Sequence, residues 1–187
     1  MKKSLILLLF CCISLPNALA QELTVAEPDF VGEVVAVLPD NTATQLEKEN
    51  IMTRTRANAS AIIFGVGKAK TKLIIESPNA GVRLNKDNDI CFVVRAVDNN
   101  SDPISIINIF RFESTGKRRL AETASVSSFG SVKSGKLEHL PYTAKKYGTG
   151  SYLIKLSEKP EGEYGITVKN PNNVDEKSVI VATFAIE

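Results

Sequence analysis

Apolar and polar residues alternate along most of the chain after its first twenty residues. Alternation with a period of two indicates half-buried β-strands, and the same stretches are rich in β-branched and aromatic residues. Turn-forming Gly, Pro, Asn and Asp separate the stretches at short intervals. No stretch shows a convincing helical period. The pattern therefore predicts an all-β protein, with strands over residues 30–38, 44–48, 51–56, 61–72, 82–84, 90–97, 104–113, 118–124, 151–156, 162–168 and 178–186.

Several of these stretches carry more specific expectations. Residues 90–97 (ICFVVRAV) are apolar on both faces, which predicts a central strand that is covered on two sides. The polar stretches 44–48 and 51–56 predict short, largely exposed strands. Residues 125–136 are rich in Ser and Gly, so we expect a loop there. In 104–113, we expect one face to carry Ile104, Ile106, Phe110 and Phe112.

The last 26 residues predict a β-hairpin. The segment GEYGITV leads through the turn residues NPNN into SVIVATFAI. A leucine ahead of Gly-Glu-Tyr at the start of the penultimate strand is typical of the tyrosine corner of immunoglobulin-like sandwiches. The hairpin is expected to point six side chains inward: Tyr164, Ile166, Val168, Ile180, Phe184 and Ile186. We therefore predict an immunoglobulin-like β-sandwich over residues 59–187, preceded by an additional N-terminal β segment, 21–58, which packs on it or forms a minor domain.

The first twenty residues (MKKSLILLLFCCISLPNALA) have the order of a secretory signal: two lysines, an apolar run, a proline and an Ala-x-Ala ending. The run is shorter than the about 20 apolar residues of a transmembrane helix. We expect cleavage after Ala20 and a secreted or periplasmic protein. Lipid modification of Cys11 or Cys12 is the alternative, which Phe10 and the apolar residues after Cys12 disfavour.

Removal of this signal changes the charge and the cysteine count. The 23 basic residues of the chain include Lys2 and Lys3, so 21 basic and 21 acidic residues remain. A net charge of zero gives no indication of nucleic acid binding. Cys91 is then the single cysteine, which excludes an intrachain disulfide and a metal cluster built on cysteines. We expect Cys91 to be a buried small apolar residue, with an intermolecular disulfide as the alternative.

Four segments follow one another along the chain: PDFVGEVV, FGVGKAKTKLIIE, FVVRAVDNNSDPISIINIFRF and GEYGITVKNPNNVDEKSVIVATFAI. In this order they resemble a group of uncharacterised secreted proteins of Gram-negative gut bacteria that carry a C-terminal immunoglobulin-like sandwich. The likeness covers nearly the whole mature chain. Because that group has no assigned activity, the resemblance implies a β-rich exported protein and no site residues.

Residues 61–72 (AIIFGVGKAKTK) contain the glycines and lysines of a candidate phosphate loop. A Walker loop needs G-x-x-x-x-G-K-[ST], but here Ala69 follows Gly67-Lys68 and Ile62 takes the place of the first glycine. A dinucleotide-binding fingerprint fails as well. No cofactor is therefore predicted, and the segment is expected to be a kinked or bulged strand.

The lysines of this segment follow a spacing of two, which places them on one strand face. Arg54 and Arg56 lie nearby in sequence. Such a face is a possible binding face for an acidic glycan or a lipid headgroup. The alternative is a solvent face on which lysines discourage edge pairing. The residues of this possible binding face are Lys68, Lys70 and Lys72.

Catalytic and metal sites find little support in the sequence. His139 is the only histidine and lies in a polar run, so it is expected to be an exposed loop residue. Ser114 and Lys117 match S-x-x-K without the companion motifs of a lactamase-type enzyme. Asn85, Asp87 and Asp89 alternate like the opening of a calcium loop, but its later glycine and glutamate positions hold Ile90 and Ala96. We expect these acids and those at 98 and 102 to form ordinary Asx turns.

The sequence thus favours an exported bacterial envelope protein that acts as a non-catalytic binding or structural module, with no catalytic, cofactor-binding or metal residues. Its partner is expected to be an envelope protein or glycan, and not nucleic acid. The expected contact surfaces are the loops 85–89, 98–103 and 125–136. The alternative is a carboxylate- or metal-dependent hydrolase of envelope or glycan substrates.

Overall fold

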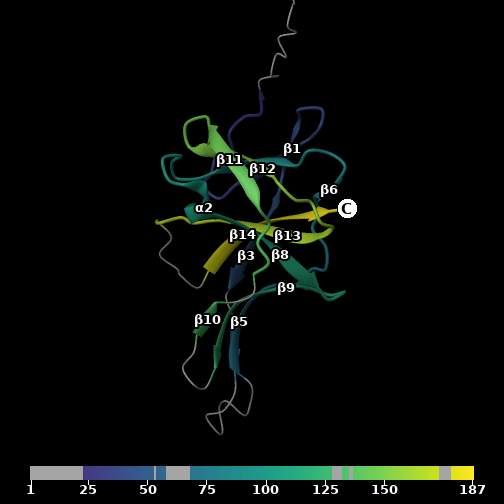
Figure 1. The fold of residues 1–187 in the computed structure, drawn as a ribbon, viewed down its shortest axis with the longest axis vertical. Helices are drawn as coiled ribbons and strands as arrows, with labels where there is room; N and C mark the ends of the chain where they lie inside the picture. Colours follow the sequence, from purple (N-terminus) through teal and green to yellow (C-terminus); the bar gives the residue numbers. More distant parts are fainter. Residues whose placement is uncertain (1–22, 53, 58–67, 128–131, 135–136, 173–177) are drawn as a thin grey trace, which may run out of the picture.

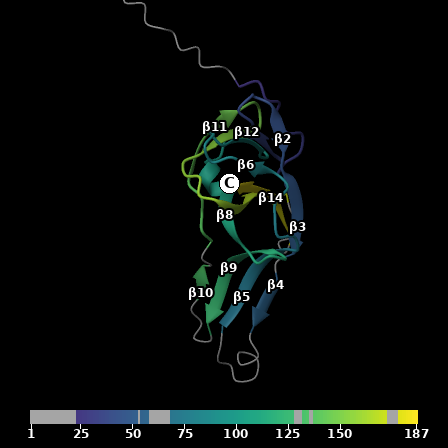
Figure 2. The ribbon, with the colours of Figure 1, turned by 90° about the vertical axis from the view of Figure 1, so that its right-hand side faces the viewer.

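The computed structural model describes residues 23–52, 54–57, 68–127, 132–134, 137–172 and 178–187. These residues form two β-sheets that pack as a sandwich, with one short helix, α2 (Pro103–Ile106). This confirms the prediction of an all-β immunoglobulin-like sandwich. Figures 1 and 2 show the sandwich and, below it, a narrower β-structure that projects along the long axis of the molecule.

The first sheet has five strands. In their order across the sheet they are β11 (Tyr142–Tyr147), β12 (Ser151–Leu156), β7 (Cys91–Arg95), β1 (Val34–Val37) and β2 (Ala43–Gln45). The neighbouring strands pair antiparallel throughout. The central position of β7 agrees with its apolar sequence, since Val93 on one face and Phe92 and Val94 on the other are fully buried.

The second sheet is longer. Its order is β3 (Glu47–Met52), β14 (Ser178–Ile186), β13 (Gly162–Val168), β8 (Ile107–Ser114), β9 (Arg119–Ser127), β5 (Lys68–Ile75) and β4 (Arg54–Ala57). At its margins β6 (Arg83–Leu84) pairs parallel with β14, and β10 (Val132–Ser134) pairs antiparallel with β9. The projecting structure, called the arm below, consists of β4, β5, β9 and β10 (Figure 2).

Two hydrophobic clusters stabilise this arrangement, and each lies on a different face of the second sheet. The smaller cluster consists of Ile51, Leu73, Ile75, Phe110, Phe112, Ala121 and Val181, and it connects the base of the arm to the sandwich. The larger one fills the space between the two sheets. Its buried members are Val34, Ala36, Leu46, Leu84, Ile90, Phe92, Val94, Ala96, Ile107, Ile109, Leu140, Tyr152, Ile154, Leu156, Tyr164, Ile166, Ala182, Phe184 and Ile186.

Strand β8 contributes to both clusters, and here one prediction is wrong. Phe110 and Phe112 lie in the smaller cluster, whereas Ile106 packs against the larger one and Ile104 is 71% exposed. The reason is the helical turn α2, which the alternation did not reveal. Asp102 caps this turn by accepting a hydrogen bond from the Ile104 amide (3.0 Å), and Pro103 follows as the first helical residue.

The predicted C-terminal hairpin is confirmed by the pairing of β13 with β14, in which Tyr164 faces Phe184. The Tyr164 hydroxyl donates a hydrogen bond to the Pro160 carbonyl (2.7 Å), as a tyrosine corner does. Ile180 was wrongly expected to point inward and is 49% exposed. It lies beyond Ala182, the last residue of β14 that pairs with β13, and therefore faces no neighbour on that side.

The N-terminal residues 23–52 contribute strands to both sheets, because β1 and β2 belong to the first sheet and β3 to the second. The strand predicted from residue 30 begins only at Val34, after a turn in which Gly32 has a φ of 85°. The expectation that 44–48 and 51–56 are largely exposed is wrong for their apolar residues, since Leu46 and Ile51 are buried. Strand β4 follows β3 after one residue.

The loop expected at residues 125–136 is wrong for the described part of that range, and residues 128–131 and 135–136 lie outside the description. Ser125–Ser127 complete β9, and β10 pairs with residues 124–126 of that strand. Strand β11 was not predicted at all, because its sequence YTAKKY is mostly polar. It lies at the edge of its sheet and pairs with a neighbour on one side only. Its polar side chains can therefore face solvent.

Candidate functional site

The arm brings basic residues of different strands onto one face. In the pairing of β4 with β5, Arg54 lies opposite Lys72 and Arg56 lies opposite Lys70. Directly opposite residues of an antiparallel pair share a face of the sheet. Both arginines therefore lie on the same face as the lysines of β5, which the sequence placed together through their spacing of two.

The next strands extend this face. Lys70 lies opposite Ser125 of β9, and Ser125 lies opposite Lys133 of β10. The register thus forms a cross-strand row of Arg56, Lys70, Ser125 and Lys133. We call the six basic positions of this surface the basic face: Arg54, Arg56, Lys68, Lys70, Lys72 and Lys133.

The sequence interpretation missed Lys133 because it treated residues 125–136 as a loop. A usable signal was present. Ala124–Ser127 and Val132–Ser134 each alternate small or apolar residues with polar ones, and Gly130 lies between the two runs. Two alternating runs separated by a few residues with a glycine predict a hairpin, which would have placed Lys133 opposite Ser125.

Apart from the buried Arg119 at its base, which lies opposite Ile75, the opposite face of the arm carries no charged residue among the described positions. One of its rows contains Thr55, Thr71, Ala124 and Ser134, and the other contains Ala57, Ala69, Val126 and Val132. Along β5 this uncharged face continues into Leu73 and Ile75 of the smaller hydrophobic cluster. The basic face is therefore the face directed away from that cluster.

An irregularity is present in β9, the partner strand of this segment, and not in the described part of the segment itself. The register between β5 and β9 shifts at Thr71 and Lys72, where Thr123 is an extra residue in β9. The Thr123 hydroxyl donates a hydrogen bond to the Thr71 carbonyl (3.2 Å). Beyond the bulge, Lys72 lies opposite Glu122, which is the one acidic residue among β4, β5, β9 and β10. Residues 61–67, the glycine-containing part of the segment, lie outside the described residues.

The register arranges the positions of the basic face as a two-dimensional array. Neighbouring strands lie about 4.8 Å apart, and alternate residues of one strand lie about 6.7 Å apart. Across the four strands the array therefore measures about 14 Å, and along β5 about 13 Å. Like charges directly opposite each other destabilise a sheet. The pairs Arg54–Lys72 and Arg56–Lys70 thus cost folding free energy, and an anion bound between them would offset that cost.

The acidic residues considered for a metal site serve turns and ion pairs. The side chains of Asn85 and Asp98 accept hydrogen bonds from the amides two residues later, which is the predicted Asx geometry. Asp89 pairs with Lys155 at 2.7 Å, and this pairing lowers the pKa of Asp89. Among the described residues, no group of three or more His, Cys, Asp or Glu side chains could hold a metal ion.

The two other candidate motifs also lie in ordinary surroundings. His139 is exposed, as predicted, and forms an isolated bridge with Phe110. Residues 114–117 form the predicted turn between β8 and β9, which the hydrogen bond from the Thr115 amide to the Arg118 carbonyl (2.9 Å) closes.

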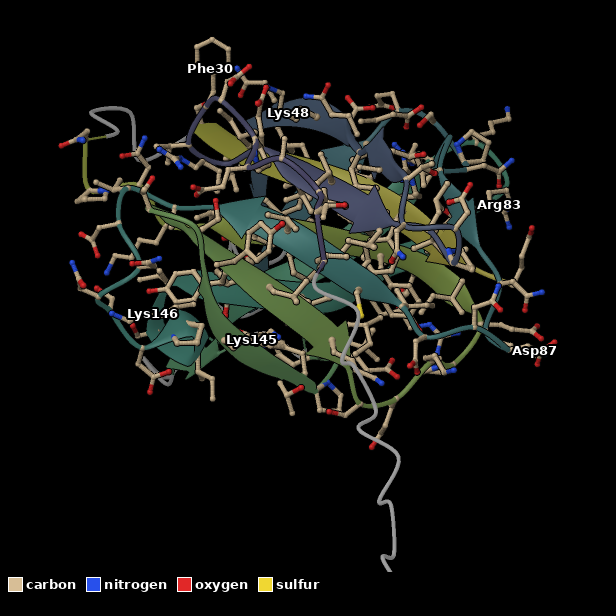
Figure 3. The ribbon with its side chains drawn as sticks, turned by 90° about the horizontal axis from the view of Figure 1, so that it is seen from above. Phe30, Lys48, Arg83, Asp87, Lys145 and Lys146 are labelled. Atoms are coloured by element: carbon tan, nitrogen blue, oxygen red, sulfur yellow. The ribbon has the colours of Figure 1, made fainter. Side chains whose placement is uncertain are left out.

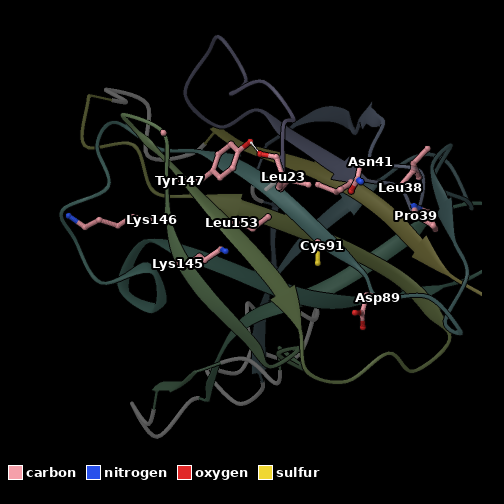
Figure 4. Close-up of a pocket in the computed structure, with 12 residues that line it drawn as sticks. Leu23, Leu38, Pro39, Asn41, Asp89, Cys91, Lys145, Lys146, Tyr147 and Leu153 are labelled. Carbon is pink, nitrogen blue, oxygen red and sulfur yellow. Dashed lines mark hydrogen bonds between the residues drawn. The ribbon is translucent and has the colours of Figure 1, made fainter. Parts of the chain in front are cut away.

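A groove of about 850 Å³ lies on the outer face of the five-stranded sheet (Figure 4). It is lined by Leu38, Cys91, Lys145, Tyr147 and Leu153, among others. Cys91 is half-buried and not fully buried as expected, because it lies on the outward face of β7. Burial raises the pKa of its thiol.

One end of this groove is bounded by an N-terminal strap, residues 23–27. The Tyr147 hydroxyl donates hydrogen bonds to the carbonyl of Leu23, which is drawn in Figure 4, and to the carbonyl of Val25. Glu27 accepts hydrogen bonds from the amides of Thr149 (2.7 Å) and Gly150 (3.1 Å) and pairs with Arg95.

The pKa of Glu27 is lowered to about 2. The largest contribution comes from the Ser151 hydroxyl, which approaches the carboxylate without a regular hydrogen bond, and the Thr149 amide follows. The strap is therefore held most firmly while Glu27 is ionised.

The chain matches no model of a known protein family, and no curated protein matches it significantly. Within the described residues, none of the helical structure is long and apolar enough to cross a membrane. The candidate site is therefore chosen from the structure alone: it is the basic face of the arm, where the strand register brings six basic residues onto one face.

Proposed function

We propose that this protein is an exported, non-catalytic binding module of the bacterial cell envelope and that it binds a polyanionic ligand through the basic face of the arm. The observation that carries this proposal is the register of β4 and β5, which sets arginine directly opposite lysine twice. A sheet selected for stability alone would alternate the signs of its cross-strand charges.

The export part of the proposal is supported by the signal-like sequence of residues 1–20 and by the resemblance to secreted bacterial proteins. The non-catalytic part is supported by the partners of the candidate acids. Asp89 is paired with Lys155, Asp102 caps α2, and Asp98 closes an Asx turn. No specific observation favours the alternative hydrolase.

The experiment measures how much protein cosediments with isolated Gram-negative cell envelopes. We expect the triple variant K68E/K70E/K72E to lose most of the binding that the wild type shows. The matched control is K145E/K146E/K169E, which makes the same change of charge at exposed positions of the sandwich. Lys145 and Lys146 belong to β11, which lies at the end of the molecule opposite the arm in Figures 1 and 2, and Figure 3 labels both lysines in a view from that end.

The control separates a specific face from net charge. If the two triple variants bind envelopes equally well, or if the arm variant binds like the wild type, the basic face is not the binding site and the proposal is wrong. Circular dichroism and thermal unfolding of each variant ensure that the compared proteins are folded.

A further inference from the structure

The charge of this protein is strongly segregated. The four strands of the arm together contain seven basic residues and one acidic residue, Glu122. The rest of the chain after residue 20 contains 14 basic and 20 acidic residues. The arm thus carries a formal net charge of +6, and the rest of residues 21–187 carries −6. Such a distribution orients a protein in an electric field, since an anionic surface attracts the arm and repels the sandwich.

The basic positions also form a two-dimensional array and not a single line. Its positions extend along β5, from Lys68 to Lys72, and across four strands, from Arg56 to Lys133. A single bound anion would contact one or two of these positions, and a linear polyanion would follow one line of them. A plane of anionic groups is the ligand that meets the whole array at once.

The register places the basic positions on the side of the arm opposite the one that packs on the sandwich. The uncharged face leads into Leu73 and Ile75 of the smaller hydrophobic cluster, so the arm packs through that face. The basic face lies on the other side of the same strands. In Figures 1 and 2 the arm projects from the sandwich, which leaves its length clear of the five-stranded sheet.

From these observations we infer that the ligand of the basic face is the headgroup plane of an anionic lipid membrane, on which the arm docks by electrostatic attraction. This inference rests on the proposed function and names its ligand class. Each basic residue near an anionic leaflet strengthens binding about fivefold. The attraction decreases within about 10 Å at 0.1 M salt, because counterions screen it.

The test uses protein expressed from the full-length sequence and vesicles of defined composition. One set contains phosphatidylglycerol and phosphatidylethanolamine, and the other contains phosphatidylcholine alone. We expect binding to the anionic vesicles, little binding to the neutral ones, and loss of binding at high salt. The neutral vesicles also report any contribution from the apolar residues of the N-terminus, which does not depend on lipid charge.

Two variants assign the binding to the arm. K68Q/K70Q/K72Q removes three positive charges and is expected to lower the vesicle partition coefficient about 100-fold. K145Q/K146Q/K169Q removes three at the sandwich and is expected to change it by less than about fivefold. Equal losses in both variants would overturn the inference, because attraction would then follow net charge and not the face.

A further binding experiment distinguishes a lipid ligand from a glycan ligand. If the protein binds an acidic polysaccharide such as polygalacturonate through the same lysines and ignores anionic vesicles, the lipid inference is wrong while the proposed function stands. If K68E/K70E/K72E still binds whole envelopes like the wild type, the proposed function itself fails. The vesicle and envelope experiments therefore report separately on the two statements.

Discussion

The sandwich and the arm differ in how their charged residues are paired. In the sandwich, buried or half-buried carboxylates face cations: Glu33 pairs with Lys48 (2.7 Å), Glu27 with Arg95 (2.7 Å) and Glu163 with Arg83 (3.1 Å). In the arm, cations face cations across β4 and β5. Both regions are built from similar antiparallel strands. The ion pairs of the sandwich stabilise its fold, whereas the like-charge pairs of β4 and β5 oppose folding, as the proposed binding face would explain.

The largest effect is expected where the two sheets meet. Phe184 packs between Phe92 of the facing sheet, at a ring distance of 4.8 Å, and Tyr164 of its own, at 5.4 Å. Replacing Phe184 with alanine should lower the free energy of unfolding by about 3 to 5 kcal/mol, because it leaves a cavity in the larger cluster. Urea unfolding measures this change. A loss below 1 kcal/mol would mean that the sandwich does not depend on this contact.

The next effect concerns a buried ion network at the base of the arm. Arg119 is fully buried, its Nη1 lies 3.7 Å from Glu163, and Glu163 also accepts a hydrogen bond from the Ala80 amide (2.7 Å). Glu163→Gln leaves the Arg119 charge without its counterion and should cost about 2 to 4 kcal/mol.

Urea unfolding of this variant beside Glu138→Gln provides the control, because Glu138 is an exposed partner of Arg111 at 3.5 Å. Exposed pairs contribute at most about 1 kcal/mol. Equal losses in the two variants would show that burial of Arg119 has no energetic consequence.

The strap should make stability depend on pH. Because the pKa of Glu27 is lowered from 4.5 to about 2 in the folded protein, the ionised carboxylate stabilises the fold above pH 4.5. That contribution, about 1 to 2 kcal/mol after allowance for solvent, should disappear as the pH falls from 4.5 towards 2. Glu27→Gln should remove this part of the pH dependence. Unfolding free energies between pH 6 and pH 2 test this, and parallel curves for both proteins would contradict it.

Loss of the tyrosine corner should have a smaller effect. Tyr164→Phe removes the hydrogen bond to the Pro160 carbonyl and retains the buried ring. We expect a decrease of about 1 kcal/mol in the free energy of unfolding, the usual net contribution of one hydrogen bond. Thermal unfolding measures it, with Tyr142→Phe as a comparison, since that hydroxyl donates to the carbonyls of Pro103 and Ile107. An unchanged unfolding midpoint for Tyr164→Phe would show that the hydrogen bond of the tyrosine corner does not stabilise the fold.

The smallest effect should have the opposite sign. Lys70 lies opposite Arg56, so Lys70→Gln removes a repulsion and should stabilise the protein by a few tenths of a kcal/mol. The gain should vanish in 0.5 M salt, where repulsion is screened. Urea unfolding at two salt concentrations measures both. A destabilised variant would show that Lys70 has a structural role and would weaken the contrast between the arm and the sandwich.

The sequence predicted the parts of the fold that depend on local patterns. The hairpin of β13 and β14 follows from alternation on either side of NPNN, and Tyr164 makes the expected bond to the backbone. The errors occurred where a neighbour decided the outcome. Ile180 alternates correctly but lies beyond the reach of β13, and the capped turn at Asp102 removes Ile104 from the strand.

In the candidate site as well, the features that depend on one strand were predicted and those that depend on neighbouring strands were not. Spacing within one strand was enough to place Lys68, Lys70 and Lys72 on one face. The contribution of Lys133 depends on a pairing between β9 and β10, which composition concealed. The like-charge pairs across β4 and β5 depend on register, and register is set by the whole sheet and its bulge. Cross-strand partners are therefore the information that one sequence provides least.

The direct succession of β3 and β4 has a mechanical consequence. Strand β3 pairs with β14 over six residue pairs in the sandwich, and β4 continues from it into the arm after one residue. A pulling force on the arm is therefore transmitted along the axis of β3. It loads the hydrogen bonds between β3 and β14 in shear, so that they must break together. A ligand bound to the arm would therefore pull parallel to β3, the direction in which all the hydrogen bonds between β3 and β14 resist together.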